Sequence, residues 1–181
     1  ATAIIRDITD RKQAERQLYE RKVQLLAAQR IQRHLLPDGP PVVPGFDIAG
    51  ATYPAEFAAG DHFDYLTMPG GGVGVVISDV SGHGFAPALL VASTQTLLQK
   101  LAESNEDVGE ILTEANAFLA GETEDDRFVT VFLGRLDPVS RSFSYASAGH
   151  PTGYIIGPDG RIKANLESTA LPLAVLPDTI I

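Results

Sequence analysis

The spacing of apolar residues predicts one long helix at the start of the chain. Between residues 10 and 36 there is no Gly or Pro, and helix-forming residues dominate. Apolar side chains recur there at spacings of three and four, with gaps at Arg21 and Gln32. These positions are Ala14, Leu18, Leu25, Ala28 and Leu35, and a looser second stripe adds Val23, Leu26, Ile31 and Leu36. Such a stripe needs a partner surface. We favour a parallel homodimer through residues 10–36, and the alternative is a helix that lies on its own domain.

A Pro- and Gly-rich linker follows at residues 37–45, and the pattern then changes to that of a mixed domain, 46–181. Alternation predicts strands over 46–53 and 62–68, and the apolar run 73–79 predicts a strand buried on both faces. Helical spacing covers 86–101 and 108–119, and a loop covers 121–126. Further strands are expected over 128–136, 142–147, 153–156 and 161–164. This order favours an α+β fold of stacked antiparallel sheets over a parallel doubly wound sheet. The β-branched ending at 178–181 predicts a strand cut short, so we expect a C-terminally incomplete domain.

Charge is unevenly distributed along the 181 residues, whose net charge is −9. Residues 1–36 hold eight Lys and Arg against four Asp and Glu, whereas the remainder holds six against nineteen. An acidic body argues against a nucleic-acid partner. The chain has no cysteine, no secretory apolar segment and no apolar run of membrane-spanning length. We therefore expect a cytoplasmic location and see no membrane segment in this chain.

Two acidic residues at the ends of predicted strands are the candidates for a chemical role. Asp61 follows Gly60, and Asp79 opens the glycine-lined stretch Asp-Val-Ser-Gly-His-Gly at 79–84, just before a predicted helix. Ends of neighbouring strands can converge, and two converging carboxylates repel unless a divalent cation lies between them. Oxygen ligands favour Mg²⁺ or Mn²⁺, and a pair of such ions promotes displacement at phosphorus. The alternative for Asp79 is a cap on the following helix. The chain has no G-x-S-x-G, H-E-x-x-H or P-loop motif.

The chain resembles the bacterial branch of the PPM-type metal-dependent protein serine/threonine phosphatases, the SpoIIE-like domains that regulate sigma factors. The matching pieces are Gln-Arg-His-Leu-Leu-Pro at 32–37, Gly-Asp-His-Phe-Asp at 60–64, residues 79–84, Phe-Val-Thr at 128–130, Ala-Gly-His-Pro at 148–151 and Leu-Pro-Leu at 171–173. Residues 7–12 resemble the end of a PAS sensor domain. The resemblances imply a PAS-like end at 1–9, a signalling and dimerisation helix at 10–36, the linker, and a phosphatase domain at 46–181.

The resemblance implies a four-layer α-β-β-α sandwich of antiparallel sheets with two Mn²⁺ or Mg²⁺ ions in a cleft. Asp79 would bridge the ions, while Asp61 and the Val80 carbonyl would bind one of them, and Asp61 and Asp79 would be catalytic. Residues that would support the site are Asp64, Gly82, His83 and Gly84, and the alternative for Asp64 is a structural role. His83 and His150 also match the motifs, and hydrogen bonds that stabilise turns are the favoured role for both. The implied substrate is a phosphorylated STAS-type anti-anti-sigma protein in a sensor-controlled stress or sigma-factor pathway.

Two features limit this expectation. Ala59 stands where the family usually has glycine, and the chain stops before the family's C-terminal acidic motifs. We therefore expect residues 1–181 to bind metal weakly and to turn substrate over slowly. The alternatives are a catalytically inactive phosphatase-like relay that acts through dimerisation, and a nucleotidyl cyclase or other two-metal signalling enzyme.

Overall fold

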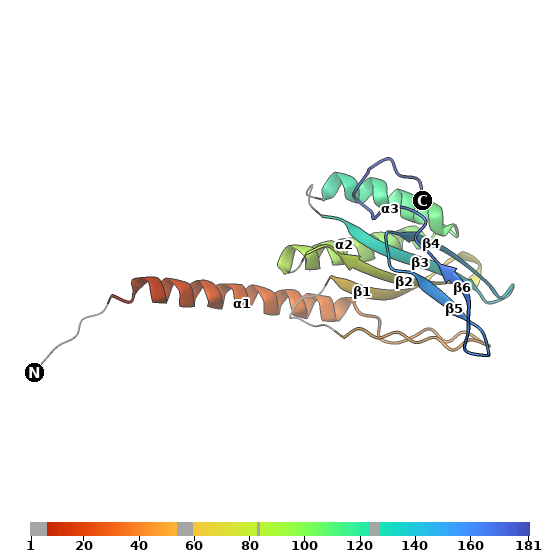
Figure 1. Cartoon of the computed structure of the whole chain (residues 1–181), viewed down its shortest axis with the longest axis horizontal. Helices are drawn as coiled ribbons and strands as arrows, with labels where there is room; N and C mark the ends of the chain where they lie inside the picture. The colour runs from red at the N-terminus through yellow and green to blue at the C-terminus, as the bar shows by residue number, and fades with distance from the viewer. Residues whose placement is uncertain (1–6, 54–59, 83, 124–126) are drawn as a thin grey trace, which may run out of the picture.

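A long helix projects from a compact body in this computed structural model, which describes residues 7–53, 60–82, 84–123 and 127–181 (Figure 1). Helix α1 (Thr9–Leu35) confirms the helix predicted over 10–36. Asp7 Oδ1 accepts hydrogen bonds from the Thr9 backbone N–H at 2.9 Å and from its hydroxyl at 2.7 Å, which fixes the start of the helix. Most of the PAS-like end expected at residues 1–9 lies outside the described residues. No helix in the described part of the chain is both long and apolar enough to cross a membrane.

The body is built on an antiparallel sheet with the strand order β1-β2-β3-β4. The strands are β1 (Asp61–Thr67), β2 (Val73–Val80), β3 (Val129–Asp137) and β4 (Ser142–Ala148), with the short 3₁₀ turn η1 (Pro69–Gly71) between the first two. Helices α2 (Phe85–Ala102) and α3 (Val108–Glu122) follow β2, and β5 (Gly153–Ile156) pairs with β6 (Ile162–Leu166) as a separate hairpin. The fold is therefore α+β with antiparallel sheets, as the order of elements predicted.

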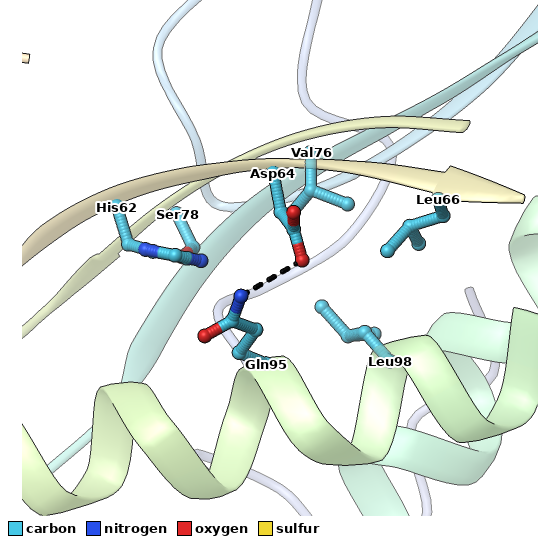
Figure 2. Close-up of a pocket in the computed structure, with 7 residues that line it drawn as sticks. All are labelled: His62, Asp64, Leu66, Val76, Ser78, Gln95 and Leu98. Carbon is cyan, nitrogen blue, oxygen red and sulfur yellow. Dashed lines mark hydrogen bonds between the residues drawn. The ribbon is translucent and has the colours of Figure 1, made fainter. Parts of the chain in front are cut away.

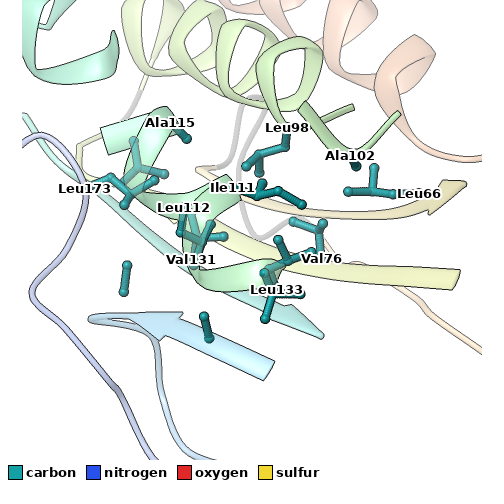
Figure 3. Close-up of a cluster of buried hydrophobic side chains, with 14 of the residues drawn as sticks. Leu66, Val76, Leu98, Ala102, Ile111, Leu112, Ala115, Val131, Leu133 and Leu173 are labelled. Atoms are coloured by element: carbon teal, nitrogen blue, oxygen red, sulfur yellow. The ribbon is translucent and has the colours of Figure 1, made fainter. Parts of the chain in front are cut away.

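The core lies between the two helices and one face of the sheet (Figure 3). Its fully buried side chains include Leu98, Ile111, Leu112, Leu119, Val131, Leu133 and Leu173. Alternate residues of β2 reach this face, so Val76 and Val80 are buried while Ile77 remains 50% exposed. The prediction that residues 73–79 are buried on both faces was wrong, because the helices cover only one face of β2. The run of valine and isoleucine residues in this strand does not by itself show which face of the sheet the helices would cover.

The β5–β6 hairpin lies against the opposite face of the sheet. A Cβ built on Gly153 would be 3.5 Å from the Phe132 ring, and Phe132 pairs in register with Ile77 on that face. The described residues thus form a helical layer, a four-stranded sheet and a hairpin. The second complete sheet and the further helical layer implied by the family resemblance are not seen among these residues.

Two predicted strands are wrong. Residues 46–53 contain no strand; a Cβ on Gly50 would come within 2.6 Å of the Phe63 ring and the Tyr65 hydroxyl. The segment therefore lies against side chains of β1 rather than pairing with its backbone. Residues 178–181 also form no strand, and the Ile181 N–H donates to Thr113 Oγ1 of α3 at 3.0 Å.

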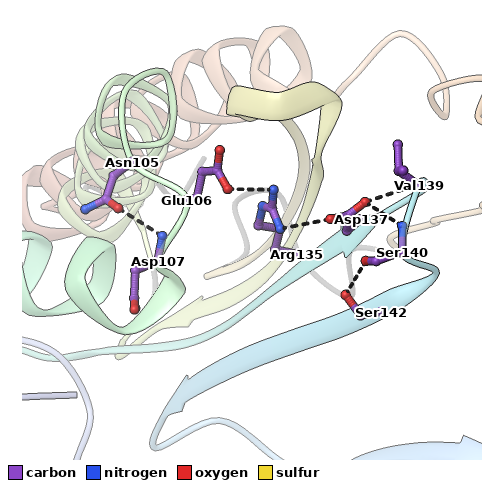
Figure 4. A network of polar contacts seen from close by, with 8 residues as sticks. All are labelled: Asn105, Glu106, Asp107, Arg135, Asp137, Val139, Ser140 and Ser142. Carbon is purple, nitrogen blue, oxygen red and sulfur yellow. Dashed lines mark hydrogen bonds and ion pairs between the residues drawn. The ribbon is translucent and has the colours of Figure 1, made fainter.

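Polar contacts stabilise the end of the sheet where β1 turns into β2 (Figure 4). Arg135 of β3 forms an ion pair of 2.9 Å with Glu106 in the α2–α3 connection, and its side chain is only 13% exposed. Asp107 caps α3 by accepting from the N–H groups of Gly109 and Glu110. These contacts fix the α2–α3 connection on the sheet and so set where both helices lie.

Candidate metal centre

Asp61 and Asp79 lie directly opposite each other on neighbouring strands. They are partners in the antiparallel register of β1 and β2. The adjacent pair is hydrogen-bonded, because the Val80 N–H donates to the Gly60 carbonyl at 3.2 Å. Asp61 and Asp79 therefore occupy the alternate, non-hydrogen-bonded type of pair, in which facing side chains approach most closely. The structure thus brings together the two carboxylates that the sequence singled out.

Both carboxylates lie on the face of the sheet that the helices leave uncovered. Burial raises the pKa of Asp79, and the charge of Asp61 raises it further. Like charges placed opposite each other on adjacent strands destabilise the sheet. A divalent cation between them would reverse this effect, because both ionised groups would then be attracted to it.

A third oxygen lies beside Asp61 and Asp79, which together are called the acid pair. A Cβ built on Gly60 would lie 2.3 Å from the Val80 carbonyl oxygen and 2.5 Å from Asp79 Oδ1. The missing side chain of Gly60 therefore leaves room beside two oxygens. Carboxylate and carbonyl oxygens of this kind fit Mg²⁺ or Mn²⁺, which keep several waters. Within the described ranges, no three His, Asp or Glu side chains are placed to share one metal ion.

The turn after Asp79 is held by Phe128, the residue before β3. The Ser81 N–H donates to the Phe128 carbonyl at 3.0 Å, and Ser81 Oγ accepts from the Phe128 N–H at 2.9 Å. Gly82 and Gly84 have positive φ angles of 91° and 108°, a region that favours glycine. His83 lies outside the described residues. The N-cap of α2 is Gly84 with no side-chain cap, so the alternative role of Asp79 as a helix cap is wrong.

Asp64 faces the helices instead of the acid pair (Figure 2). Its carboxylate is 4% exposed and accepts from Gln95 Nε2 at 2.9 Å and from Gln99 Nε2 at 2.8 Å. Gln95 Nε2 also donates to the Leu35 carbonyl at the end of α1, at 2.7 Å. The contacts favour the structural role for Asp64 over a role in supporting the metal site, because this residue fastens α2 and, through Gln95, the end of α1 to β1.

His62 lies on the same helix-facing side as Asp64. It is 5% exposed, and its Nε2 has no hydrogen-bond partner. Burial lowers the pKa of His62, and the charge of Asp64 opposes that shift. The neutral ring therefore belongs to the packing between β1 and α2.

Thr130 and His150 adjoin the acid pair, and residue-type reasoning did not place them there. Thr130 pairs in register with Asp79, and its Oγ1 lies 2.9 Å from His150 Nδ1 and 3.4 Å from the Asp79 carbonyl oxygen. Burial lowers the pKa of His150, while the charge of Asp61 raises it. The signal that could have found them is the pair of motifs at 128–130 and 148–151.

A hollow of about 200 Å³ opens beside Asp61. Its lining residues are Ala51, Thr52, Tyr53, Asp61, His62, Phe63 and Ile77. Asp61 is therefore reachable from the uncovered face of the sheet, next to the apolar and aromatic side chains that line the hollow.

Solved structures share this architecture. A crystal structure of RsbU and RsbW domains from Mycobacterium tuberculosis is 31% identical, with a TM-score of 0.57, and covers 66% of this chain and 34% of that one. The PP2C phosphatase domain of SpoIIE from Bacillus subtilis, solved with a fragment of its regulatory domain, gives a TM-score of 0.58 at 22% identity and covers 67% of this chain and 36% of that one. The fold is that of PP2C-type phosphatase domains.

The chain belongs to the SpoIIE family, because the family model described as Stage II sporulation protein E matches residues 69–181, more than half of its length. Phosphoserine phosphatase RsbU of Bacillus subtilis is 25% identical over 159 residues, which cover 88% of this chain and 47% of RsbU. Phosphoserine phosphatase RsbP of the same organism is 25% identical over 162 residues, covering 87% and 40% respectively. The chain therefore spans less than half the length of these relatives.

Proposed function

We propose that the protein is a metal-dependent serine/threonine phosphatase that hydrolyses phosphoserine or phosphothreonine on a regulatory protein. The observation that carries this proposal is the direct opposition of Asp61 and Asp79 across β1 and β2. Two acids at the closest type of cross-strand pair are unfavourable in themselves. A centre for divalent cations gives this arrangement a use, and the named relatives RsbU and RsbP are phosphoserine phosphatases.

The residues of the site have separable roles. Asp79 would hold both Mn²⁺ or Mg²⁺ ions, and Asp61 with the Val80 carbonyl would hold one of them. When bound, the ions supply a hydroxide nucleophile and stabilise charge on the phosphoryl group. Gly60 leaves room beside the two oxygens, and Ser81 with Gly82 and Gly84 fixes the turn that carries them.

The substrate we propose is a phosphorylated STAS-type anti-anti-sigma protein in a sensor-controlled sigma-factor pathway in the cytoplasm. Residues 1–9 would be the end of a PAS-like sensor, and 10–36 a signalling helix that forms a homodimer. The linker at 37–45 would join this helix to the catalytic domain. The support is the likeness to RsbU and RsbP together with the long, exposed helix α1.

The test replaces Asp79 with Asn in the full-length gene product. Asn keeps the shape of the side chain but removes the charge that would bind both ions. We expect release of phosphate from a phosphoserine protein at saturating Mn²⁺ to fall by at least about three orders of magnitude, the scale of losing the main electrostatic term. A variant with near wild-type turnover would end the proposal. Asp159→Asn, on an exposed turn of the β5–β6 hairpin, is the matched control and should keep full activity.

One observation favours a second candidate, an inactive phosphatase-like relay that acts through dimerisation. Among the described residues only two carboxylates, with one carbonyl, converge at the site. Residues 1–181 should therefore bind Mn²⁺ weakly, and full occupancy at micromolar Mn²⁺ by calorimetry would contradict this. A full-length gene product that shows no Mn²⁺-dependent phosphate release on any phosphoserine protein would favour the relay.

A further inference from the structure

His150 lies on the same side of the sheet as the acid pair, and the contacts of the preceding residue, Gly149, fix the backbone there. The preceding residue, Gly149, bridges to Val131 of β3, and its N–H donates to the Ala170 carbonyl at 2.9 Å and lies 2.7 Å from Ser168 Oγ. Gly149 has a φ of 64°, and a Cβ there would be 2.3 Å from Pro172 Cγ. The motif at 148–151 therefore fits against the motif at 171–173, and only glycine allows that approach.

The His150 ring is oriented by Thr130. Thr130 Oγ1 lies 2.9 Å from His150 Nδ1 and 3.4 Å from the Asp79 carbonyl oxygen. A hydroxyl has one proton, so two arrangements satisfy these contacts. In one, the Thr130 hydroxyl donates to Nδ1, and the ring proton lies on Nε2. In the other, Nδ1–H donates to Thr130 Oγ1, the hydroxyl donates to the Asp79 carbonyl oxygen, and Nε2 carries no proton. In the first arrangement, the one on which the inference depends, the neutral ring offers an N–H donor for a ligand.

The surroundings of the ring restrict what that donor can do. The His150 ring lies near the acid pair, because it contacts Thr130, the register partner of Asp79, and the charge of Asp61 raises the pKa of His150 against the effect of burial. In the described part of the chain, however, it forms no three-residue metal-binding group with the acids. A group beside the acid pair that presents an N–H is suited to an anion held there.

We propose that His150 is a substrate-positioning residue whose Nε2–H donates a hydrogen bond to a phosphoryl oxygen of the bound phosphomonoester. Thr130 is the positioning residue that fixes the ring in the required tautomer. This inference rests on the proposed function, because the phosphoryl group is its ligand. A hydrogen bond to a charged group is worth enough to change binding about 10- to 100-fold.

The first test follows the histidine tautomer by nitrogen NMR at pH 8, in protein labelled with ¹⁵N at histidine. We expect wild type and Thr130→Ser to carry the proton on Nε2, because both keep the hydroxyl. Thr130→Val removes the hydroxyl without changing the shape of the side chain, and should shift the ring towards a mixture of tautomers. A wild-type ring with the proton on Nδ1 would overturn the inference.

The second test adds inorganic phosphate in the presence of Mg²⁺. We expect the His150 Nε2 resonance to move together with the backbone amides of Asp61 and Asp79. If phosphate moves those amides and leaves His150 unchanged, the inference fails while the proposed function survives. If phosphate moves none of them, the anion site itself is wrong and both fail.

The third test is kinetic and uses a phosphoserine peptide with the full-length gene product. His150→Leu should raise KM about 10- to 100-fold, and His150→Gln, whose amide can place an N–H near the position of Nε2, should recover most of the loss. Thermal unfolding should be alike for the two variants. Unchanged KM in both variants, or no recovery by Gln, would assign His150 to structure alone. Thr96→Val, which removes a hydroxyl bonded to its own helix at Ala92, is the control for Thr130→Val and should leave KM unchanged.

Discussion

Gly60 lies so close to Asp79 that a methyl group on it would be 2.5 Å from Asp79 Oδ1 and 2.3 Å from the Val80 carbonyl oxygen. Neither contact can exist, so a side chain at this position must displace one or both oxygens. Gly60→Ala should therefore weaken Mn²⁺ binding by about 10- to 100-fold, the usual cost of disturbing the groups that orient metal ligands. Isothermal titration calorimetry with Mn²⁺ measures the effect directly.

The control for this substitution is Gly121→Ala. Gly121 is an exposed residue of α3, and a Cβ there would meet nothing within 4 Å. Alanine should raise helix stability by up to about 1 kcal/mol and leave Mn²⁺ binding unchanged. Equal Mn²⁺ affinities for Gly60→Ala and Gly121→Ala would show that the oxygens beside Gly60 do not bind the metal.

Asp79→Asn should have opposite effects on stability with and without metal. The pKa of Asp79 is raised in the folded protein, so its protonated form favours folding. That stability is present below the ordinary carboxyl pKa and is lost as pH rises through the raised value. In chelator at pH 7, Asn should therefore be the more stable residue by about 0.2–1 kcal/mol, the range for a facing like-charge pair.

Saturating Mn²⁺ should reverse that order, because the metal stabilises only the folded state that binds it. Urea unfolding of wild type and Asp79→Asn, in chelator and in Mn²⁺, tests both expected orders of stability. A variant less stable than wild type in chelator would mean that Asp61 and Asp79 do not repel each other in the folded protein.

Residue spacing could place the acid pair, but only partly its surroundings. The short connection between the strands predicted at 62–68 and 73–79 indicates that the two strands pair, and so that Asp61 and Asp79 can meet. The alternation of side chains along a strand explains why Asp64 lies apart from the acid pair. Asp64 is three positions from Asp61, and an odd spacing along a strand puts two side chains on opposite faces.

Other features depend on contacts that no local pattern records. The residues at 46–53 alternate as a strand does, but alternation does not show whether a backbone partner exists. Thr130 and His150 meet because Gly149 bridges to Val131 in parallel, a tertiary contact across 18 positions by their numbering. The motifs marked these segments, and only the fold showed which atoms they bring together.

His62 should make the protein less stable in mild acid. Burial lowers its folded pKa below the ordinary histidine value of about 6.5, so the unfolded chain binds the proton more readily. The stability from the neutral ring is present above that value and is lost as pH falls below it, with a slope of at most about 1.4 kcal/mol per pH unit. His62→Phe keeps a ring in the space and cannot titrate.

Urea unfolding in chelator at pH 7.5 and 5.5 compares the two proteins. We expect His62→Phe to lose less stability than wild type between these two pH values. Equal losses would show that His62 does not contribute to the acid sensitivity of the fold.

Gln95 and Gln99 offer a matched pair for the contact between α1 and the sheet. Both donate to Asp64 Oδ2, but Gln95 also donates to the Leu35 carbonyl. Gln95→Leu should cost about 1–3 kcal/mol, because it leaves a partly buried carbonyl and part of a buried carboxylate unpaired. It should also speed amide hydrogen exchange in the last turn of α1.

Gln99→Leu should lower stability less and leave exchange in that turn unchanged, because the bond to Leu35 remains. Hydrogen exchange followed by mass spectrometry resolves the two cases. The same exchange increase in both variants would mean that Asp64, and not the direct bond from Gln95, fixes the end of α1.

Helix α1 should hold two copies of the protein together. Leu18 is 70% exposed, and Val23 and Leu26 are also exposed, so this part of the apolar stripes has no cover within the described residues, whereas Leu35 packs against the core of the body. Burial of an apolar stripe against a second copy of the helix would remove that surface from water, with about 25 cal/mol gained per Å² buried.

Light scattering should therefore report a dimer for the wild-type chain. Glutamate at both Leu18 and Leu25 places charge in the stripe and should give a monomer, whereas Gln17→Glu adds charge beside the stripe and should stay dimeric. A wild-type monomer, or a double variant that remains a dimer, would exclude pairing through this helix.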